Sequence, residues 1–368
     1  MTRINVGNVK IKRRYLDRLK QAKGLSESSI VSIERALNKY DEFADGLDYR
    51  AFTSSKAVAF RKWLTEHQGK DKPVSAATAY YVIRQVRGFF MWLSGEPGFR
   101  SKITADSVTY LSLDLKTVRA ATSPKFTSSP TLDYVLKLVQ SIEPVNEIDV
   151  RDRALIAFLL LSGMRVLAIA TLPLGCFDPE TNLIDQDPAK GVHTKFGKTI
   201  ITKLLPFDRQ LLDYVLEWHK YLATTRLFGQ TDPFFPSTKM QQSDDGFSFE
   251  AVGVEPVFWS TASPIHRILR ERSEHARLPY FKPHAFRHAA IHLAMRFSRN
   301  AEETKALSQN FGHENIGTTL LTYGNLDTYR VIEVIKKMDF GGKAAGALST
   351  DQINEMIGML ESLKDKTD

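Results

Sequence analysis

Apolar side chains recur every three or four residues from Ser26 to about Gly46, a spacing that predicts an amphipathic helix. The apolar positions of this helix are Ile30, Ile33, Leu37, Tyr40 and Phe43. Serine precedes the pattern and glycine follows it, as is typical of helix ends. The basic stretch from Lys10 to Lys20 predicts a further helix ahead of it.

Two more amphipathic helices follow. One begins after Ser54 and ends before Gly69, with apolar positions at Val58, Phe60, Trp63 and Leu64. The other opens at Ser75 and ends near Gly95, and its inward positions are Val82, Ile83, Val86, Phe89, Phe90 and Leu93. Residues 1–110 therefore predict a small helical bundle.

Residues 120–130 are rich in Ser, Thr, Ala and Pro and have no apolar periodicity, which indicates a linker between domains. Beyond the linker, the patterns predict helices within 132–142, 152–162, 209–224, 263–275, 284–297 and 301–311. Short β-prone runs at 183–184 and 198–205, joined by a loop at 191–197, predict a hairpin. We expect the polar, Gly-containing segment 241–253 to be a surface loop.

These patterns give a mainly α fold with a small β-sheet. The expected domains are a helical domain at 1–119, the linker at 120–130, a mixed α/β domain at 131–340 and a tail at 341–368. The tail follows a Gly-rich joint and carries apolar residues at helical spacing, at Ile353, Met356, Ile357, Leu360 and Leu363. A terminal amphipathic helix of this kind can dock on a neighbouring subunit.

The charge is distributed unevenly along the chain. The sequence has 50 basic and 42 acidic residues, a net charge of +8. Residues 1–120 hold 22 basic and 12 acidic side chains, whereas the remainder holds 28 and 30. The whole positive excess is therefore N-terminal, which permits a polyanionic partner there. Within it, Arg84 and Arg87 share one helix face, and a solvated face and phosphate contact are equally good interpretations.

Composition excludes several classes of protein. The single cysteine, Cys176, excludes an intramolecular disulfide framework and a cysteine-based zinc finger. The longest apolar run, residues 154–161, is far shorter than the about 20 residues of a membrane-spanning helix. The N-terminus has no secretory pattern, so we expect a cytoplasmic protein without a membrane partner.

Six polar residues stand out by their order in the second domain. They are Arg165 in SGMR, Lys195 in HTKFGK, His284 and Arg287 in HAFR, His313 in FGHEN and Tyr323 in LLTYGN. This order, together with the surrounding segments KPHAFRHAA and LSQNFGHENIGTTLLTYGN, resembles the tyrosine recombinases, the family of phage integrases and chromosome-dimer resolvases.

The resemblance spans about residues 10–335 and implies a fold, a reaction and partners. The fold would be a helical core-binding domain followed by a tyrosine-recombinase catalytic domain, closed as a clamp around double-stranded DNA. The protein would be a site-specific recombinase, an integrase of a mobile element. It would act as a tetramer on paired recombination half-sites through a Holliday junction. No cofactor and no metal are expected.

The chemistry of a phosphodiester explains why these residue types would be used. Arg165 and Arg287 can neutralise the non-bridging oxygens while staying protonated. The tyrosine hydroxyl, with an ordinary pKa of about 10, needs electrostatic help or a base to become a nucleophile, and His284 is the candidate base. His313 would donate a hydrogen bond to the phosphate, and Lys195 would protonate the 5′ oxygen.

The sequence departs from the family pattern in two places. Ala168 stands where the family usually has an acidic residue that supports the first arginine. The interval from His313 to Tyr323 is ten residues, where nine is common, and Tyr329 is the reserve nucleophile. Lys198 is the alternative to Lys195 as general acid.

Other hypotheses stay open at this point. His284, His288 and His292 recur every four residues and would line a helix face as metal ligands do, although Arg287 beside them disfavours a dication. A DNA-binding protein without cleavage activity and a type IB topoisomerase-like strand transferase are the alternatives to a recombinase.

Overall fold

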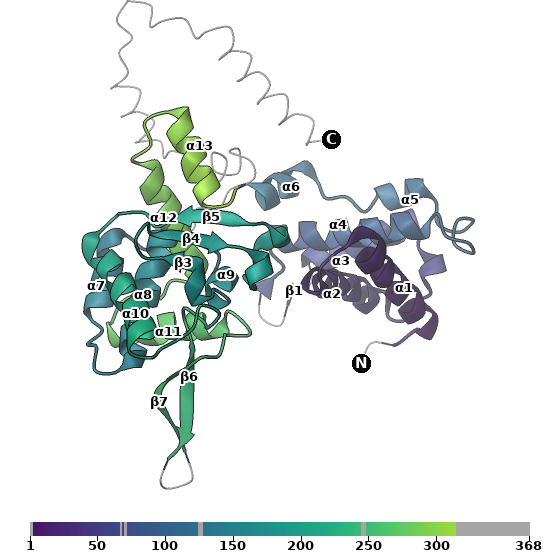
Figure 1. The fold of residues 1–368 in the computed structure, drawn as a ribbon. Coiled ribbons are helices and arrows are strands. Elements are labelled where there is room, and N and C mark those ends of the chain that lie inside the picture. Colours follow the sequence, from purple (N-terminus) through teal and green to yellow (C-terminus); the bar gives the residue numbers. More distant parts are fainter. Residues whose placement is uncertain (1–2, 67, 70–71, 124–127, 244–247, 314–368) are drawn as a thin grey trace, which may run out of the picture. The chain divides into compact units, whose positions relative to one another are not determined.

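The computed structural model describes residues 3–66, 68–69, 72–123, 128–243 and 248–313 (Figure 1). The chain divides into two compact units, an N-terminal unit of residues 1–126 and a C-terminal unit of residues 127–368. Helices dominate both units, and the strands form small antiparallel sheets. The predicted fold class, mainly α with a small β-sheet, is confirmed.

The N-terminal unit is a bundle of helices with a very short strand pair. Its elements are α1 (Val6–Lys23), α2 (Glu27–Ala44), α3 (Ser54–Glu66), β1 (Gln68–Gly69), β2 (Lys72–Pro73), α4 (Ala76–Leu93), α5 (Ala105–Thr109) and α6 (Leu115–Thr122). The four helices expected in this unit are confirmed. Ser26 and Ser75 cap α2 and α4, since each hydroxyl accepts from the backbone N–H three residues later.

Aromatic side chains from several helices fill the core of this unit. Phe90 of α4 stacks on Phe52 with ring centroids 4.1 Å apart and meets Tyr40 of α2 edge-on at 4.7 Å. One expected core position is wrong. Val58 is 41% exposed, and the neighbouring Ala57 is fully buried instead, because the apolar stripe of α3 runs through Ala57, Phe60 and Leu64.

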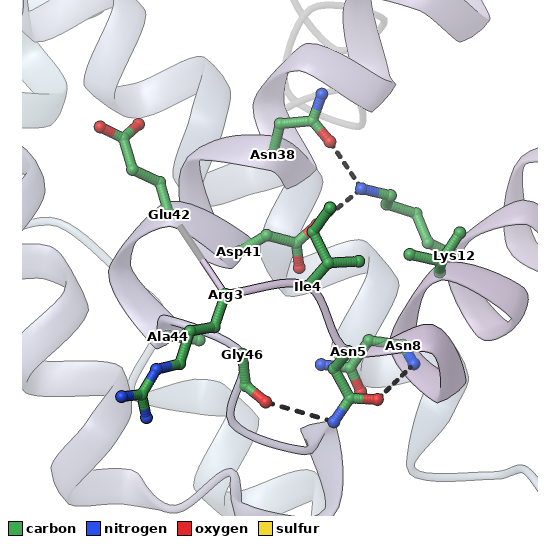
Figure 2. A pocket seen from close by; sticks show the side chains of 11 residues that line it. Arg3, Ile4, Asn5, Asn8, Lys12, Asn38, Asp41, Glu42, Ala44 and Gly46 are labelled. Atoms are coloured by element: carbon green, nitrogen blue, oxygen red, sulfur yellow. Dashed lines mark hydrogen bonds and ion pairs between the residues drawn. The ribbon is translucent and has the colours of Figure 1, made fainter. Parts of the chain in front are cut away.

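The start of α1 is tied to α2 by polar contacts around a hollow of about 420 Å³ (Figure 2). The Lys12 ammonium donates to Asn38 Oδ1 and Asp41 Oδ2, both at 2.6 Å. The Asn5 amide donates to Gly46 O at 3.2 Å. These contacts neutralise Lys12 and fix the first turn of α1 against the end of α2.

In the C-terminal unit, the other elements pack around one buried helix, α8 (Glu147–Ser162). The elements of this unit are α7 (Leu132–Gln140), α8 (Glu147–Ser162), α9 (Val166–Ala170), β3 (Phe177–Asp178), β4 (Leu183–Gln186), β5 (Ile200–Lys203), α10 (Arg209–Thr224), β6 (Ser237–Gln242), β7 (Phe249–Glu255), α11 (Ser263–His275), α12 (Pro283–Met295) and α13 (Ala301–Asn310). Helix α8 is buried on all sides along residues 154–161 and packs against α7, α10 and α12. It starts at Glu147, before the expected Asp152, since Asn146 and Asp149 form a capping box.

Strands β3, β4 and β5 form an antiparallel sheet in that order. The hairpin expected in this region is confirmed, with Ile184 opposite Thr202. Strand β5 lies at the edge of the sheet, and the loop that carries Lys195 and Lys198 connects it to β4.

The expected surface loop at 241–253 is wrong. Strands β6 and β7 pair there as an antiparallel hairpin that extends away from the helices of the unit (Figure 1). Tertiary contacts hold its base: Glu147 Oε1 accepts from Val254 N, and Arg226 donates to Val254 O at 2.9 Å. Side chains from distant parts of the chain fix this hairpin, and the strand sequences have no alternating pattern that would predict it.

The predicted linker and tail lie partly or wholly outside the described residues. Helix α6 includes residues 120–122, the first part of the expected linker, and residues 124–127 lie outside the description. The tail at 341–368 also lies outside it, so the domain boundaries remain predictions. Within the described ranges, every helix is too short or too polar to span a bilayer.

The aromatic core predicts a large difference between two adjacent residues of α4. Phe90 is fully buried, so Phe90→Ala should destabilise the N-terminal unit by about 3–5 kcal/mol. Met91 is 40% exposed, and Met91→Ala should change stability by less than about 1 kcal/mol. Urea denaturation followed by circular dichroism measures both, and equal losses would contradict this description of the core.

Candidate active site

The guanidinium of Arg287 lies at the centre of the candidate site. Arg287 is on α12 and only 3% exposed. It donates to Gly163 O at 2.6 Å and to Phe311 O at 2.7 Å, and its Nη2 lies 2.8 Å from His313 Nε2. One buried cation thus joins the end of α8, the middle of α12 and the segment that follows α13.

Gly163 permits this convergence. It ends α8 in the left-handed conformation, with φ of 56°, which favours glycine. A Cβ added there would lie 2.6 Å from Phe311 Cε1 and 3.2 Å from Ala290 Cβ. Any larger residue would push Phe311 away and with it the carbonyl that Arg287 binds.

Arg165 follows two residues after this turn and is half-buried at the N-terminus of α9. Its positive charge acts on both His284 and His313, since it lowers the pKa of each. Ala168 is 1% exposed in the core of the unit, so the position where the family has an acidic residue is occupied here by a packed methyl group.

His313 has a defined tautomer in this arrangement. A guanidinium can only donate, so Nε2 of His313 accepts from Arg287, and the ring proton of the neutral imidazole is on Nδ1. Burial, and then the charges of Arg287 and Arg165, lower the pKa of His313 from its usual 6.5 to about 4. His313 is therefore neutral at pH 7.

His284 lies at the start of α12 and is exposed to solvent. Partial desolvation, Arg287 and Arg165 lower its pKa. Its ring meets that of His288 edge-on, with centroids 4.7 Å apart, and burial and His284 lower the pKa of His288 to about 4. A neutral imidazole next to two guanidiniums can accept a proton, as a general base must.

The described residues do not support the hypothesis that His284, His288 and His292 bind a metal ion. In the ranges that the structure describes, no three His, Cys, Asp or Glu side chains are grouped closely enough to bind a metal ion. The depressed pKa values of these histidines follow from burial and from nearby cations, including Arg296 beside His292.

The two candidate lysines lie on the loop between β4 and β5. Lys195 is exposed in a short 3₁₀ turn, and its ammonium lies 4.8 Å from the ring centroid of Phe196. Phe196 is itself 74% exposed and has a left-handed φ of 65°. Lys198 lines an open hollow of about 520 Å³ together with His313, whereas Lys195 is outside that lining.

The structure therefore brings together Arg165, His284, Arg287 and His313, while Lys195 is on an exposed loop of the same unit. Tyr323 and the reserve Tyr329 lie outside the described residues. Arg84 and Arg87 belong to the N-terminal unit, where both are exposed on α4. Among the described residues of that unit, neither forms an ion pair.

Sequence reasoning missed the contacts that place these residues. Gly312 has a left-handed φ of 66°, and an added Cβ would lie 2.6 Å from Ile200 Cδ1. Asn310 pairs with the backbone of Lys203. The glycines directly before Met164-Arg165 and before His313 were the available signal, because glycine next to a functional residue often marks a close backbone approach.

Comparison with known proteins identifies the family. Residues 131–330 match the phage integrase family, and residues 13–96 match the N-terminal SAM-like domain of phage integrases. The tyrosine recombinase XerD of Vibrio cholerae is 25% identical over 323 residues, which cover 86% of this chain and 92% of the relative. XerD of Pseudomonas aeruginosa is 24% identical over 310 residues, with coverage of 83% and 89%.

Solved structures share the fold at low identity. A lambda integrase dimer bound to a COC′ core site has a TM-score of 0.58 at 16% identity, over 86% of this chain and 78% of that one. The Tn1549 transposon integrase in complex with transposon right end DNA also has a TM-score of 0.58, at 13% identity, over 89% and 99% of the two chains.

The fold has two units and is mainly helical, and two arginines and two histidines are gathered in the C-terminal unit. These features are those of a DNA strand-transferase, and the match to the phage integrase family covers more than half of the chain. The chain belongs to the phage integrase family, the tyrosine recombinases. It is a site-specific recombinase, as the resemblance in the sequence implied.

The electrostatic link between Arg165 and the two histidines can be tested directly. Because a nearby cation disfavours the imidazolium, Arg165→Gln should raise the pKa of both His284 and His313. The pKa of His292 should not move, since burial and Arg296 lower it. Histidine side-chain NMR over a pH series measures all three.

Arg296→Gln is the matched control, and it should raise the pKa of His292 alone. An unchanged pKa of His313 in Arg165→Gln would contradict the convergence of these residues.

Proposed function

We propose that this recombinase cuts and rejoins DNA through a 3′-phosphotyrosyl intermediate at Tyr323. The observation that carries the proposal is the convergence of Arg165, His284, Arg287 and His313 on one side of α12. Two guanidiniums and two neutral imidazoles in one place suit a phosphodiester, whose charge must be neutralised while a proton is removed from the nucleophile.

In the proposed step, the oxygen of Tyr323 forms a bond to phosphorus, and the bond from phosphorus to the 5′ oxygen breaks. His284 takes the proton of the tyrosine hydroxyl. Arg165 and Arg287 bind the non-bridging oxygens. The phosphotyrosyl bond conserves the energy of the phosphodiester, so a 5′-hydroxyl of another strand can reseal it without a cofactor.

The tautomer of His313 refines its proposed role. A hydrogen bond from this ring to a phosphate oxygen has to come from Nδ1, because Nε2 accepts from Arg287. His313 therefore acts both as the acceptor that orients Arg287 and as a donor to the phosphate.

The 5′ oxygen leaving group needs a proton, and we propose Lys195 as its source. The exposed loop of Lys195 would meet the phosphate when DNA is bound. Lys198 remains the alternative, and its position on the hollow beside His313 supports keeping it.

We further propose double-stranded DNA with paired half-sites as the substrate, with integration or excision of a mobile element as the outcome. Solved structures with the same fold include a lambda integrase tetramer bound to a Holliday junction, which supports a tetramer on DNA for this chain. The tail at 341–368 would join neighbouring protomers. We propose the cytoplasm as its location.

The N-terminal unit would grip the duplex. It carries the positive excess of the chain, and Arg84 and Arg87 present two guanidiniums on one exposed face of α4. Such charges bind phosphates and release counterions, without reading bases.

Covalent capture tests the nucleophile. With a DNA site that carries a trapping nick, the protein should form a covalent adduct in EDTA, and Tyr323→Phe should abolish it because the attacking oxygen is gone. Denaturing gel electrophoresis measures the adduct. Tyr329→Phe is the control and should retain it.

An adduct that persists in Tyr323→Phe and disappears in Tyr329→Phe would overturn the assignment. DNA binding without any adduct would favour a DNA-binding protein that lacks cleavage, and relaxation of supercoils without sequence preference would favour a topoisomerase-like enzyme.

Salt dependence tests the proposed phosphate contacts. Replacing both Arg84 and Arg87 by alanine should weaken binding to specific and non-specific DNA alike. It should also reduce the slope of log affinity against log salt by about 0.9 per lost contact. Fluorescence anisotropy measures both quantities. Lys39→Ala is the control because Lys39 already pairs with Glu42, and a double variant that behaves like this control would refute the contact.

A further inference from the structure

Asn310, the last residue of α13, pairs with the edge of the small sheet as another strand would. Its Oδ1 accepts from Lys203 N at 2.7 Å, and its Nδ2 donates to Lys203 O at 3.1 Å. Both main-chain groups of Lys203 on the exposed edge of β5 are thereby satisfied by one side-chain amide. This arrangement fixes α13 in register with β5.

A second contact from the same strand supports the first. The Thr202 hydroxyl donates to Asn310 O at 2.8 Å and accepts from the Gln186 amide at 2.7 Å. Thr202 is fully buried and Gln186 is 4% exposed. Because buried polar groups are costly to leave without partners, this relay from β4 through β5 to α13 has little freedom to slip. We name Gln186, Thr202 and Asn310 the Asn310 clamp.

The clamp and Arg287 both hold the segment at the end of α13, the clamp from strand β5 and Arg287 from helix α12. Arg287 of α12 binds the carbonyl of Phe311, the residue directly after Asn310. Two residues further on is His313, whose Nε2 accepts from Arg287. The short segment that places His313 is therefore held by the sheet at Asn310 and by α12 at Phe311.

The clamp also acts on the lysine loop. Strand β5 begins at Ile200, directly after the loop that carries Lys195 and Lys198. Ile200 lies so close to Gly312 that a Cβ on the glycine would be 2.6 Å from Ile200 Cδ1. The exit of the lysine loop and the segment of His313 are thus fastened to one another.

We propose that Asn310 is a positioning residue, which with Thr202 and Gln186 holds the lysine loop in register with Arg287 and His313. The protonated leaving oxygen and the bound phosphate oxygens belong to one phosphate, so their protein partners must keep a fixed spacing. This inference rests on the proposed function, in which the loop supplies the general acid.

The test compares two leaving groups in single-turnover adduct formation. One nicked substrate has the ordinary 5′ oxygen at the cleavage position, and the other has sulfur in its place. A thiolate leaves without a proton, so the sulfur substrate bypasses any defect in the general acid. A variant with a misplaced lysine loop is slow only on the oxygen substrate.

Asn310→Ala should slow adduct formation on the oxygen substrate by about 10²-fold, the size of effect that a small misplacement of a catalytic group produces. On the sulfur substrate it should react at nearly the rate of the unsubstituted protein. Gln309→Ala is the matched control, an exposed amide on the preceding residue, and it should react normally on both substrates.

Thr202 gives a second, independent pair of variants. Thr202→Val removes the hydroxyl at nearly constant volume and should show the same contrast between substrates, whereas Thr202→Ser keeps the hydroxyl and should restore the rate on oxygen. This pair keeps the test decisive where Asn310→Ala fails to fold.

Two outcomes would overturn the proposal: unchanged rates on the oxygen substrate in Asn310→Ala and Thr202→Val, or equal slowing on both substrates. The second would mean that the clamp acts on the fold or on phosphate binding and does not position the lysine loop. The unsubstituted protein separates this proposal from the proposed function, because absence of any adduct with either substrate would count against the latter alone.

Discussion

A guanidinium that is 3% exposed must find its hydrogen-bond acceptors inside the protein, and Arg287 finds them in Gly163 O, Phe311 O and His313 Nε2. Burying a charge without such partners would be far too costly, so the three segments that supply them have to meet. Glycine at position 163 is what lets Phe311 come close enough. The geometry of the candidate site thus depends on solvating one buried cation.

Burial and the same cation together set the protonation of the neighbouring histidines. Burial, Arg287 and Arg165 together keep the pKa of His313 at about 4 and lower that of His284. Both rings are therefore neutral at pH 7, because burial and the two permanent positive charges beside them disfavour the imidazolium. A neutral histidine can accept the proton of a tyrosine, and an always charged arginine can bind phosphate, so one electrostatic arrangement prepares both roles.

The sequence predicted what local patterns encode. The serine caps and apolar spacing of α2 and α4 predict their limits closely. The order of the six polar residues from Arg165 to Tyr323, with their surrounding segments, indicates the family that the family match then confirms. Local sequence predicts a loop where the hairpin β6–β7 forms, because Glu147 and Arg226, distant in sequence, hold the base of the hairpin. The role of Asn310 could not be predicted for the same reason, because its partner Lys203 is in β5, distant in sequence.

The two kinds of arginine in this chain suit two different tasks. Arg84 and Arg87 are exposed, and contacts with a duplex through such side chains are broken easily by salt. Arg287 is fixed by three hydrogen bonds before any DNA arrives, so the energy of binding is not needed to orient it. Preorganised charge stabilises a transition state most effectively because it does not have to rearrange during the reaction. In the proposed function, duplex binding through Arg84 and Arg87 and cleavage at Arg287 therefore depend on separate parts of this chain and can be altered separately.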